Sequence, residues 1–159
     1  MRDLLVPLLR LPALEPHLAA LRPHGIVVRR SRSYEMSQTR RFVSRFFTEQ
    51  WADETLIAFS RAPISCHIAT HERKIIGFAV ADVTARGFFG PTGVDPAYRG
   101  KGLGTALLLA ALYGLRELGY VYGIIGWAGP VSFYMKTVNA TPIEASVPGI
   151  YSDLLDPDE

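Results

Sequence analysis

The sequence has few cysteines and little net charge. Cys66 is the single cysteine among 159 residues, so no internal disulfide can form, and no cluster of cysteine and histidine has the spacing of a metal site. The 17 basic side chains nearly balance the 15 acidic ones, for a formal net charge of +2, which is too small to predict a nucleic-acid partner. We therefore expect a cytoplasmic protein with neither a bound metal nor a nucleic-acid partner.

Long apolar runs are absent as well. Pro7 and Pro12 interrupt the leucine-rich residues 1–24, which are too short to span a bilayer and a poor match for a targeting signal. We predict instead a helical N-terminal extension that packs against the domain, or against a second subunit in a homodimer, without touching a membrane. Residues 25–159 are predicted to form a single domain, because no linker or internal repeat divides them.

Runs of β-branched and aromatic residues predict strands, and apolar residues at helical spacing predict helices. The expected strands cover 25–32, 64–70, 74–84, 88–94 and 121–127, with a last strand from 141 onward. The expected helices lie within 34–59, at 101–118 and at 130–138. Strands that first meander and then alternate with helices indicate one mixed α/β domain of the α+β type. Proline cannot donate to a strand ladder, so Pro91 predicts a distortion in its strand.

Three glycines occupy alternate positions in Arg99-Gly100-Lys101-Gly102-Leu103-Gly104, directly before a long predicted helix. Glycine weakens helices, but it lets backbone N–H groups approach an anion without a Cβ between them. The free N–H groups at the helix start and the cations Arg99 and Lys101 favour the same kind of ligand. The stretch therefore predicts a phosphate or pyrophosphate site, and an ordinary glycine-rich turn is the alternative.

Two familiar nucleotide motifs do not match this stretch. In a P-loop, serine or threonine follows the Gly-Lys pair, whereas Gly102 follows Lys101 here. In a Rossmann fingerprint the third glycine comes three residues after the second, and Thr105 occupies that position. Neither motif explains the glycines.

The same stretch, preceded by Val94-Asp95-Pro96 and followed by a long amphipathic helix, resembles the acyl-CoA signature of the GNAT-type N-acetyltransferases. The order of the expected elements also resembles that family from about residue 26 to residue 155. The resemblance implies the GNAT fold, in which helices flank a mixed, mostly antiparallel central sheet and two neighbouring strands splay apart. It also implies acetyl-CoA (CoA) as the co-substrate.

By this resemblance, two segments bind the cofactor. Backbone amides of the glycine stretch and the helix start would hold the CoA pyrophosphate, and the end of the distorted strand would pair with the pantetheine amides like an added strand. The implied residues are Thr92, Gly93, Val94, Arg99, Gly100, Lys101, Gly102, Leu103, Gly104 and Thr105. The distortion of that strand would open the slot for the thioester.

The segment Phe133-Tyr134-Met135-Lys136 resembles the family segment whose tyrosine protonates the CoA sulfur. Tyr134 is therefore the expected general acid, because a phenol with a pKa of about 10 stays protonated at neutral pH. An aromatic anchor that packs the short helix on the sheet is the alternative. The backbone N–H of Val94 is the expected oxyanion donor.

Two positions depart from the family pattern, and the general base is not identifiable. Trp127 stands where many members carry asparagine, and Asn139, one place later than the usual glycine, must end the helix in the left-handed conformation. Asp82 is the first candidate for the base, ahead of Asp53 and Glu54, although an exposed carboxylate is the ordinary interpretation of each. A water chain is a further alternative.

We expect direct transfer of an acetyl group from acetyl-CoA to a primary amine of a small molecule or a protein. The aromatic-rich residues 46–54 suit a partly apolar, cationic acceptor. A non-catalytic acyl-CoA-binding sensor or interaction module is the first alternative, and binding of another phosphorylated ligand is the second.

Overall fold

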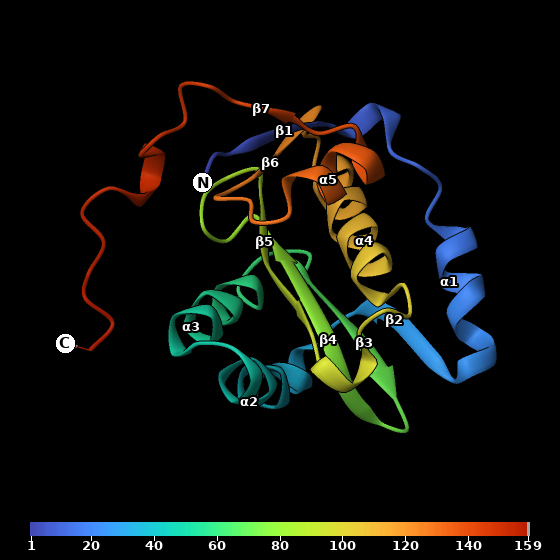
Figure 1. Ribbon diagram of the computed structural model, residues 1–159. Coiled ribbons are helices and arrows are strands. Elements are labelled where there is room, and N and C mark those ends of the chain that lie inside the picture. The colour runs from blue at the N-terminus through green and yellow to red at the C-terminus, as the bar shows by residue number, and fades with distance from the viewer. Residues whose placement is uncertain (159) are drawn as a thin grey trace.

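Seven strands form one sheet in the order β2-β3-β4-β5-β6-β1-β7 (Figure 1) in the computed structural model, which describes residues 1–158. The strands are β1 Leu4–Pro7, β2 Ile26–Arg30, β3 Cys66–His71, β4 Lys74–Ala81, β5 Phe88–Val94, β6 Tyr122–Ile125 and β7 Thr141–Pro142. The helices are α1 Glu15–Leu21, α2 Met36–Phe46, α3 Glu49–Ala58, α4 Leu103–Glu117 and α5 Val131–Val138. β5 and β6 pair in parallel and the other neighbours pair antiparallel. The expected mixed, mostly antiparallel sheet flanked by helices is confirmed.

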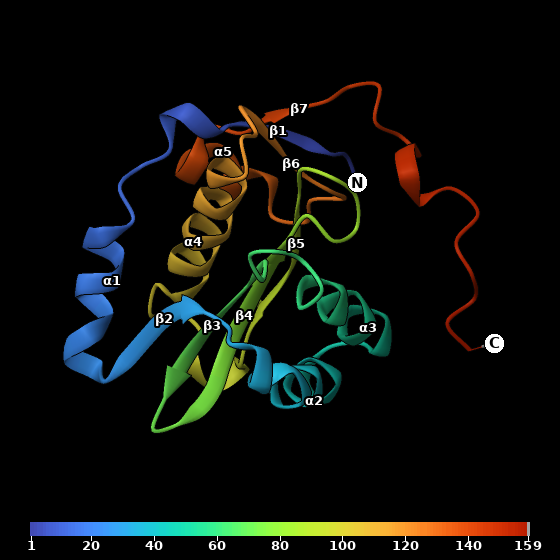
Figure 2. The ribbon, with the colours of Figure 1, turned by 180° about the vertical axis from the view of Figure 1, so that it is seen from behind.

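Helices cover both faces of the sheet and create two cores. α2 and α3 lie on one face, and α4 lies on the other together with α1 and α5 (Figures 1 and 2). β4 serves both cores, because side chains of a strand alternate between its two faces. Phe78 and Val80 pack with α2 and α3, whereas Ala79 and Ala81 belong to the core beneath α4.

The long helix α4 lies close against the sheet because β4 carries small side chains beneath it. A Cβ added to Gly77 would lie 2.9 Å from Cδ1 of Leu107, so the helix could not approach a larger residue as closely. The helix ends at Gly119 as the sequence predicts, with a φ of +100° at that glycine. The N–H groups of Gly119 and Tyr120 donate to carbonyls of the last turn, which is the Schellman cap.

The N-terminal segment differs from the helical extension expected for residues 1–24. Its first ordered element is the strand β1, which pairs with β6 on one side and β7 on the other, and α1 forms only later. Leu4 and Val6 are fully buried in the core beneath α4. A strand of four residues is too short to show the alternating pattern of a strand in its sequence. The leucines around it are spaced like the apolar face of a helix, so the sequence predicts a helix instead.

β5 and β6 separate shortly after they meet. They pair only through Phe88 with Ile124 and Phe89 with Ile125 in the described chain, while β5 continues along β4 as far as Val94. The register between β4 and β5 shifts between Ala79 and Ala81, close to the expected distortion. The splayed strand pair implied by the glycine signature is therefore confirmed.

Two connections show how local sequence shapes the sheet. The β3–β4 hairpin turns at Glu72 and Arg73, which have φ values of +48° and +63°, without the usual Asn-Gly pair. The last strand, expected from residue 141 onward, is limited to Thr141–Pro142, because proline cannot continue a ladder.

None of the helices in residues 1–158 combines the length and the apolar composition that crossing a bilayer requires.

Candidate active site

The loop between β5 and α4 is shaped by two glycines in the left-handed region. Gly100 has a φ of +79° and Gly102 a φ of +85°, conformations that residues with a Cβ rarely adopt. Gly102 is also the N-cap of α4. Asp95 fixes the start of the loop, since its Oδ1 accepts a hydrogen bond from the N–H of Ala97 at 2.9 Å.

The start of α4 presents N–H groups to open space. The first hydrogen bond of the helix runs from Ala106 N–H to the carbonyl of Gly102 at 3.2 Å, so the amides of residues 103–105 precede the intrahelical ladder. A Cβ added to Gly100, Gly102 or Gly104 would meet no atom of residues 1–158 within 4 Å. The glycines therefore leave a hollow at the positive end of the helix dipole, and this hollow fits a phosphate group.

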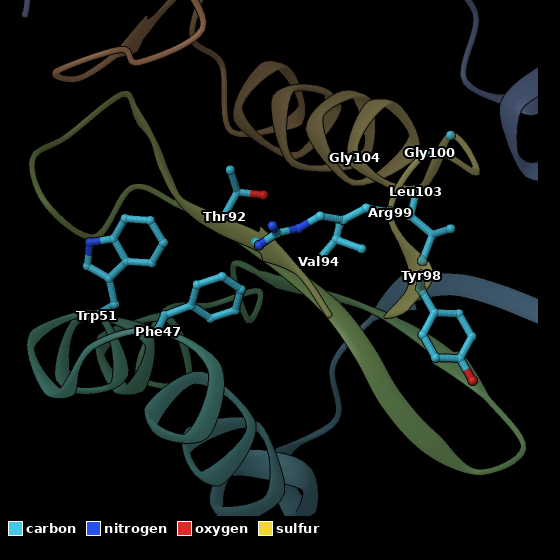
Figure 3. Close-up of a pocket in the computed structure, with 11 residues that line it drawn as sticks. Phe47, Trp51, Thr92, Val94, Tyr98, Arg99, Gly100, Leu103 and Gly104 are labelled. Carbon is cyan, nitrogen blue, oxygen red and sulfur yellow. The ribbon is translucent and has the colours of Figure 1, made fainter. Parts of the chain in front are cut away.

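A cavity of about 340 Å³ connects this hollow with the end of β5 and with the corner between α2 and α3 (Figure 3). It is lined by Phe47, Trp51, Thr92, Gly93, Val94, Tyr98, Arg99, Gly100, Gly102, Leu103 and Gly104. Eight of the ten residues expected to bind the cofactor are among them, and Lys101 and Thr105 are not. The Nζ of Lys101 lies instead 5.3 Å from the ring centre of Tyr98.

Two aromatic rings close the cavity opposite the glycine hollow. Phe47 follows α2, Trp51 lies on α3, and their rings stack with centroids 5.6 Å apart. Both belong to the aromatic segment 46–54 that is expected to suit an acceptor, and the contact of Phe47 with Gly93 is a feature that the sequence does not predict. In Figure 3 the side chain of Arg99 extends over β5 toward the region between Thr92 and Phe47, and this exposed arginine is one of the residues that line the cavity.

The backbone of β5 has free hydrogen-bonding groups on the edge opposite β4, beyond the residues that pair with β6. Asp95 N–H donates to the Ile76 carbonyl at 2.8 Å, and Gly77 and Val94 are register partners. In an antiparallel ladder these two facts make Gly77 and Val94 a pair without hydrogen bonds between them. The N–H and C=O of Val94 therefore point away from β4, toward the opening between β5 and β6.

A model of the acetyltransferase (GNAT) family matches residues 33–130, which is more than half of the chain. The chain belongs to the GNAT acetyltransferase family. No curated protein sequence matches it.

Solved structures share the fold of this GNAT chain at low sequence identity. A glucosamine N-acetyltransferase region of a fungal multi-domain GH3 β-N-acetylglucosaminidase aligns with a TM-score of 0.72 and 15% identity, covering 89% of this chain and 19% of that one. A GCN5-related N-acetyltransferase from Sphaerobacter thermophilus aligns with a TM-score of 0.68 and 19% identity, covering 89% and 48%. The chain thus spans about a fifth and about half of the length of these two structures.

Tyr134 of the GNAT chain lies on α5, outside the lining of the cavity. Its side chain is buried, and its ring packs edge-to-face against Phe89 at 6.3 Å, where β5 and β6 are still paired. Burial raises the pKa of Tyr134 above its usual value, so the phenol stays protonated at neutral pH. Asn139 ends α5 with a φ of +53°, as the sequence predicts.

Trp127, which stands in place of the family asparagine, is held by both ends of the chain. Its N–H donates to Oδ1 of Asp3 at 2.8 Å, and its ring stacks on Tyr151 with centroids 4.9 Å apart and planes 11° apart. The Tyr151 side chain lies so close to Gly126 that a Cβ there would overlap the hydroxyl. Burial, and then the negative charges of Asp3 and Glu54, raise the pKa of Tyr151 to about 12.

Asp82, the first candidate for the general base, is a buried structural carboxylate. Its oxygens accept hydrogen bonds from Gly87 N–H at 2.7 Å, from Arg86 at 2.7 Å and from the Tyr120 hydroxyl at 2.8 Å. Burial alone would raise its pKa, but these bonds outweigh burial and hold the pKa of Asp82 below its ordinary value. A carboxylate so occupied is a poor proton acceptor.

Glu54 has the opposite character. It follows Trp51 by one helical turn on α3, is partly buried, and accepts a hydrogen bond from Thr84 Oγ1 at 2.8 Å. Burial raises the pKa of Glu54 above its usual range despite that bond. Asp53 beside it is exposed and pairs with Arg40 at 3.2 Å.

Residues 1–158 hold no group of three or more His, Cys, Asp or Glu side chains placed to share a metal ion.

Proposed function

We propose that this GNAT chain transfers an acetyl group from acetyl-CoA directly to a primary amine. The observation that carries the proposal is the single cavity that joins the glycine hollow at the start of α4 to the unpaired end of β5. The hollow fits a pyrophosphate, and the free strand edge fits an amide-bearing arm, so one ligand that has both parts would fill the cavity.

Different residues of the cavity would bind different parts of the cofactor. The amides of residues 103–105 and the glycines before them would bind the pyrophosphate, and Arg99 would turn from β5 toward the phosphate oxygens. The backbone groups of Thr92 and Val94 would pair with the pantetheine amides. The N–H of Val94 would also donate to the thioester oxygen as negative charge develops on it.

The reaction needs one proton at the departing sulfur and loses one from the attacking nitrogen. The neutral amine attacks the thioester carbonyl, the C–N bond forms, and the C–S bond breaks as the thiolate accepts the proton of the Tyr134 hydroxyl. Because Tyr134 lies outside the cavity lining in the free chain, this step requires α5 to bring the hydroxyl to the sulfur when the cofactor is bound. The proton released from the amide nitrogen returns to the phenolate directly or through water. The balance is one thioester and one amine converted to one amide and one thiol.

Glu54 is the proposed proton acceptor for an amine that arrives as an ammonium. It lies one turn beyond Trp51, which lines the cavity, and its charge acts on Tyr151 beside Trp127. A carboxylate whose pKa is raised by burial binds a proton more readily than an exposed one. The stacked rings of Phe47 and Trp51 would pack against the apolar part of the acceptor, and a cation would be favoured beside such rings.

The test is release of free thiol from acetyl-CoA in the presence of a panel of primary amines. Tyr134→Phe should lower kcat by a factor on the order of 10² or more and leave the dissociation constant of CoA almost unchanged. Tyr122→Phe is the matched control, because that phenol is 56% exposed at the start of β6 and should have no effect.

Two outcomes would change the assignment. If CoA binds but no amine releases thiol, the chain is a non-catalytic acyl-CoA-binding module. If amines are acetylated and Tyr134→Phe retains full kcat, the acetyltransferase function stands but Tyr134 is only an aromatic anchor of α5.

A further inference from the structure

A strongly basic hollow, larger than the cavity of the candidate active site, lies beside that site. It is a groove of about 1350 Å³ between α2 and the sheet, formed by β2, β3 and β4 near the β3–β4 turn. Seven basic and three acidic side chains line it. This gives the groove a formal charge of +4, twice that of the whole chain, so the remaining residues together carry −2. We call it the basic groove.

Most of the cations of the basic groove have no carboxylate partner among residues 1–158. Arg29 pairs with Glu35, and Arg40 pairs with Glu49 and Asp53. The other five make no ion pair among residues 1–158, and all five are exposed: Arg32, Arg41, Arg45, Arg73 and Lys74. Five unpaired cations in one groove repel one another, and an anionic occupant would relieve that repulsion.

The floor of the basic groove is apolar, which narrows the kind of anion that fits it. Val27, Phe42, Phe46 and Ile68 contribute to it, and Val27 is 50% exposed. Single-stranded nucleic acid binds through open aromatic platforms, but Phe42 is buried and the guanidinium of Arg45 covers the ring of Phe46 at 5.1 Å. Acidic side chains interspersed with aliphatic ones match such a groove.

The C-terminal part of this chain has that composition. Residues 137–159 contain five acidic side chains and no basic one, whereas residues 1–136 contain all 17 basic and ten acidic side chains. The sequence Ser152-Asp153-Leu154-Leu155-Asp156-Pro157-Asp158 places two leucines and a proline among three aspartates. Leu154 is 58% exposed and Leu155 is 90% exposed. We call residues 152–158 the acidic segment.

The acidic segment does not occupy the basic groove of its own chain. None of residues 99–158 lines the groove, and Figure 1 shows the red C-terminal segment running free of the domain and reaching the level of α3. The stack of Tyr151 on Trp127 fixes the start of the acidic segment to the end of β6. A second copy of the chain can present the segment without releasing that stack.

We propose that the acidic segment of one copy docks in the basic groove of a second copy. Each chain has one groove and one segment, so two copies can exchange their segments reciprocally and close into a two-fold dimer. Asp153 and Asp156 would face the arginines of α2, and Leu154 and Leu155 would cover the apolar floor. Tyr98 lines both the groove and the candidate active site, so the docked segment lies beside the cofactor cavity.

The experiment measures molar mass over a range of concentrations by analytical ultracentrifugation. The unchanged chain should be a dimer whose dissociation constant rises with salt, because the charged contacts are screened. The groove variant Arg41→Glu with Arg45→Glu and the segment variant Asp153→Lys with Asp156→Lys should each raise the dissociation constant by a factor of ten or more. Arg10→Glu with Arg116→Glu is the matched control, since both arginines are exposed and lie outside the groove.

An equimolar mixture of the groove variant and the segment variant gives the sharpest result. Each contact in the mixed dimer again joins opposite charges, so the mixture should dimerise where the separate variants do not. A chain that is monomeric at all concentrations would overturn the proposal, and so would a dimer that survives in the groove variant. Circular dichroism of each variant verifies that the fold is retained.

Discussion

The ring of Phe47 lies directly against the backbone of Gly93, so closely that a Cβ on this glycine would overlap three atoms of the ring. Gly93 lies in the part of β5 that β6 has left, and Phe47 begins the connection from α2 to α3. The contact places the aromatic wall of the cavity against the strand that is proposed to pair with the cofactor. The width of the cavity therefore depends on the absence of a side chain at residue 93.

Gly93→Ala should destabilise the protein by about 1–3 kcal/mol, because the added methyl group must displace a packed ring. It should also weaken CoA binding, since a displaced Phe47 enters the cavity. Urea unfolding and calorimetric titration with CoA measure the two effects. Combining the change with Phe47→Leu should recover much of the lost stability, and additive losses in the double variant would show that the two residues do not interact.

Gly104→Ala should separate folding from ligand binding. Gly104 lies in the first turn of α4, where none of the described residues comes within 4 Å of an added Cβ, and alanine is the better helix former by about 0.5–1 kcal/mol. The free protein should therefore become slightly more stable, while CoA binding becomes at least tenfold weaker because the methyl group enters the hollow. Thermal unfolding and calorimetric titration provide the two measurements.

Gly114→Ala is the control for Gly104→Ala in the same helix. An added Cβ there would meet His67 Cε1 at 3.4 Å, within van der Waals contact and away from the cavity. CoA affinity should not change in this variant. Equal CoA affinities for both glycine variants would exclude a phosphate site at the start of α4.

Asp82→Asn should cost about 1–3 kcal/mol of unfolding free energy at pH 7, because the buried carboxylate accepts three hydrogen bonds. The pKa of Asp82 is lowered in the folded state. The carboxylate therefore adds stability above its unfolded-state pKa of about 3.9, and that stability is lost as the pH falls through the lower folded value. Urea unfolding should show the full difference at pH 7 and a smaller one when the pH is below that unfolded-state pKa; an equal difference at both pH values would contradict this account.

Glu54→Gln should lower kcat/KM by a factor on the order of 10² and change the pH profile. The pKa of Glu54 is raised by burial, so in the unchanged enzyme kcat/KM should rise with pH as this carboxyl ionises, above the ordinary glutamate value of 4.5. The variant should lack that ascending limb. Asp53→Asn, which removes the exposed neighbouring carboxylate, should keep it. If Glu54→Gln retains the limb, another group accepts the proton.

The sequence predicts those parts of the fold that depend on the type of a single residue or on its near neighbours in the chain. Gly119 and Asn139 end helices because the left-handed conformation favours glycine and asparagine, and both positions are evident from the residue type. The glycines before α4 likewise indicate an anion site by their type and spacing, without information on residues distant in the sequence. The hollow at the cavity was predictable for the same reason.

Features that depend on distant partners escaped prediction. β1 is a strand because β6 and β7 supply its hydrogen bonds, and nothing in its own sequence separates it from a leucine-rich helix. Asp82 was expected to be exposed, but the distant Tyr120 folds against it. Phe47 lines the cavity because β5, which is distant in the sequence, places Gly93 against its ring.

Calorimetric titration of the protein with CoA, in parallel with ATP and NAD, tests the central claim most directly. The account predicts one CoA site per chain, no binding of ATP or NAD at the same concentrations, and a thermal midpoint that rises with CoA because the ligand binds the native state. Binding of ATP or NAD in place of CoA, or no heat of binding at millimolar CoA, would contradict the assignment of the cavity and remove the basis of the proposed transfer.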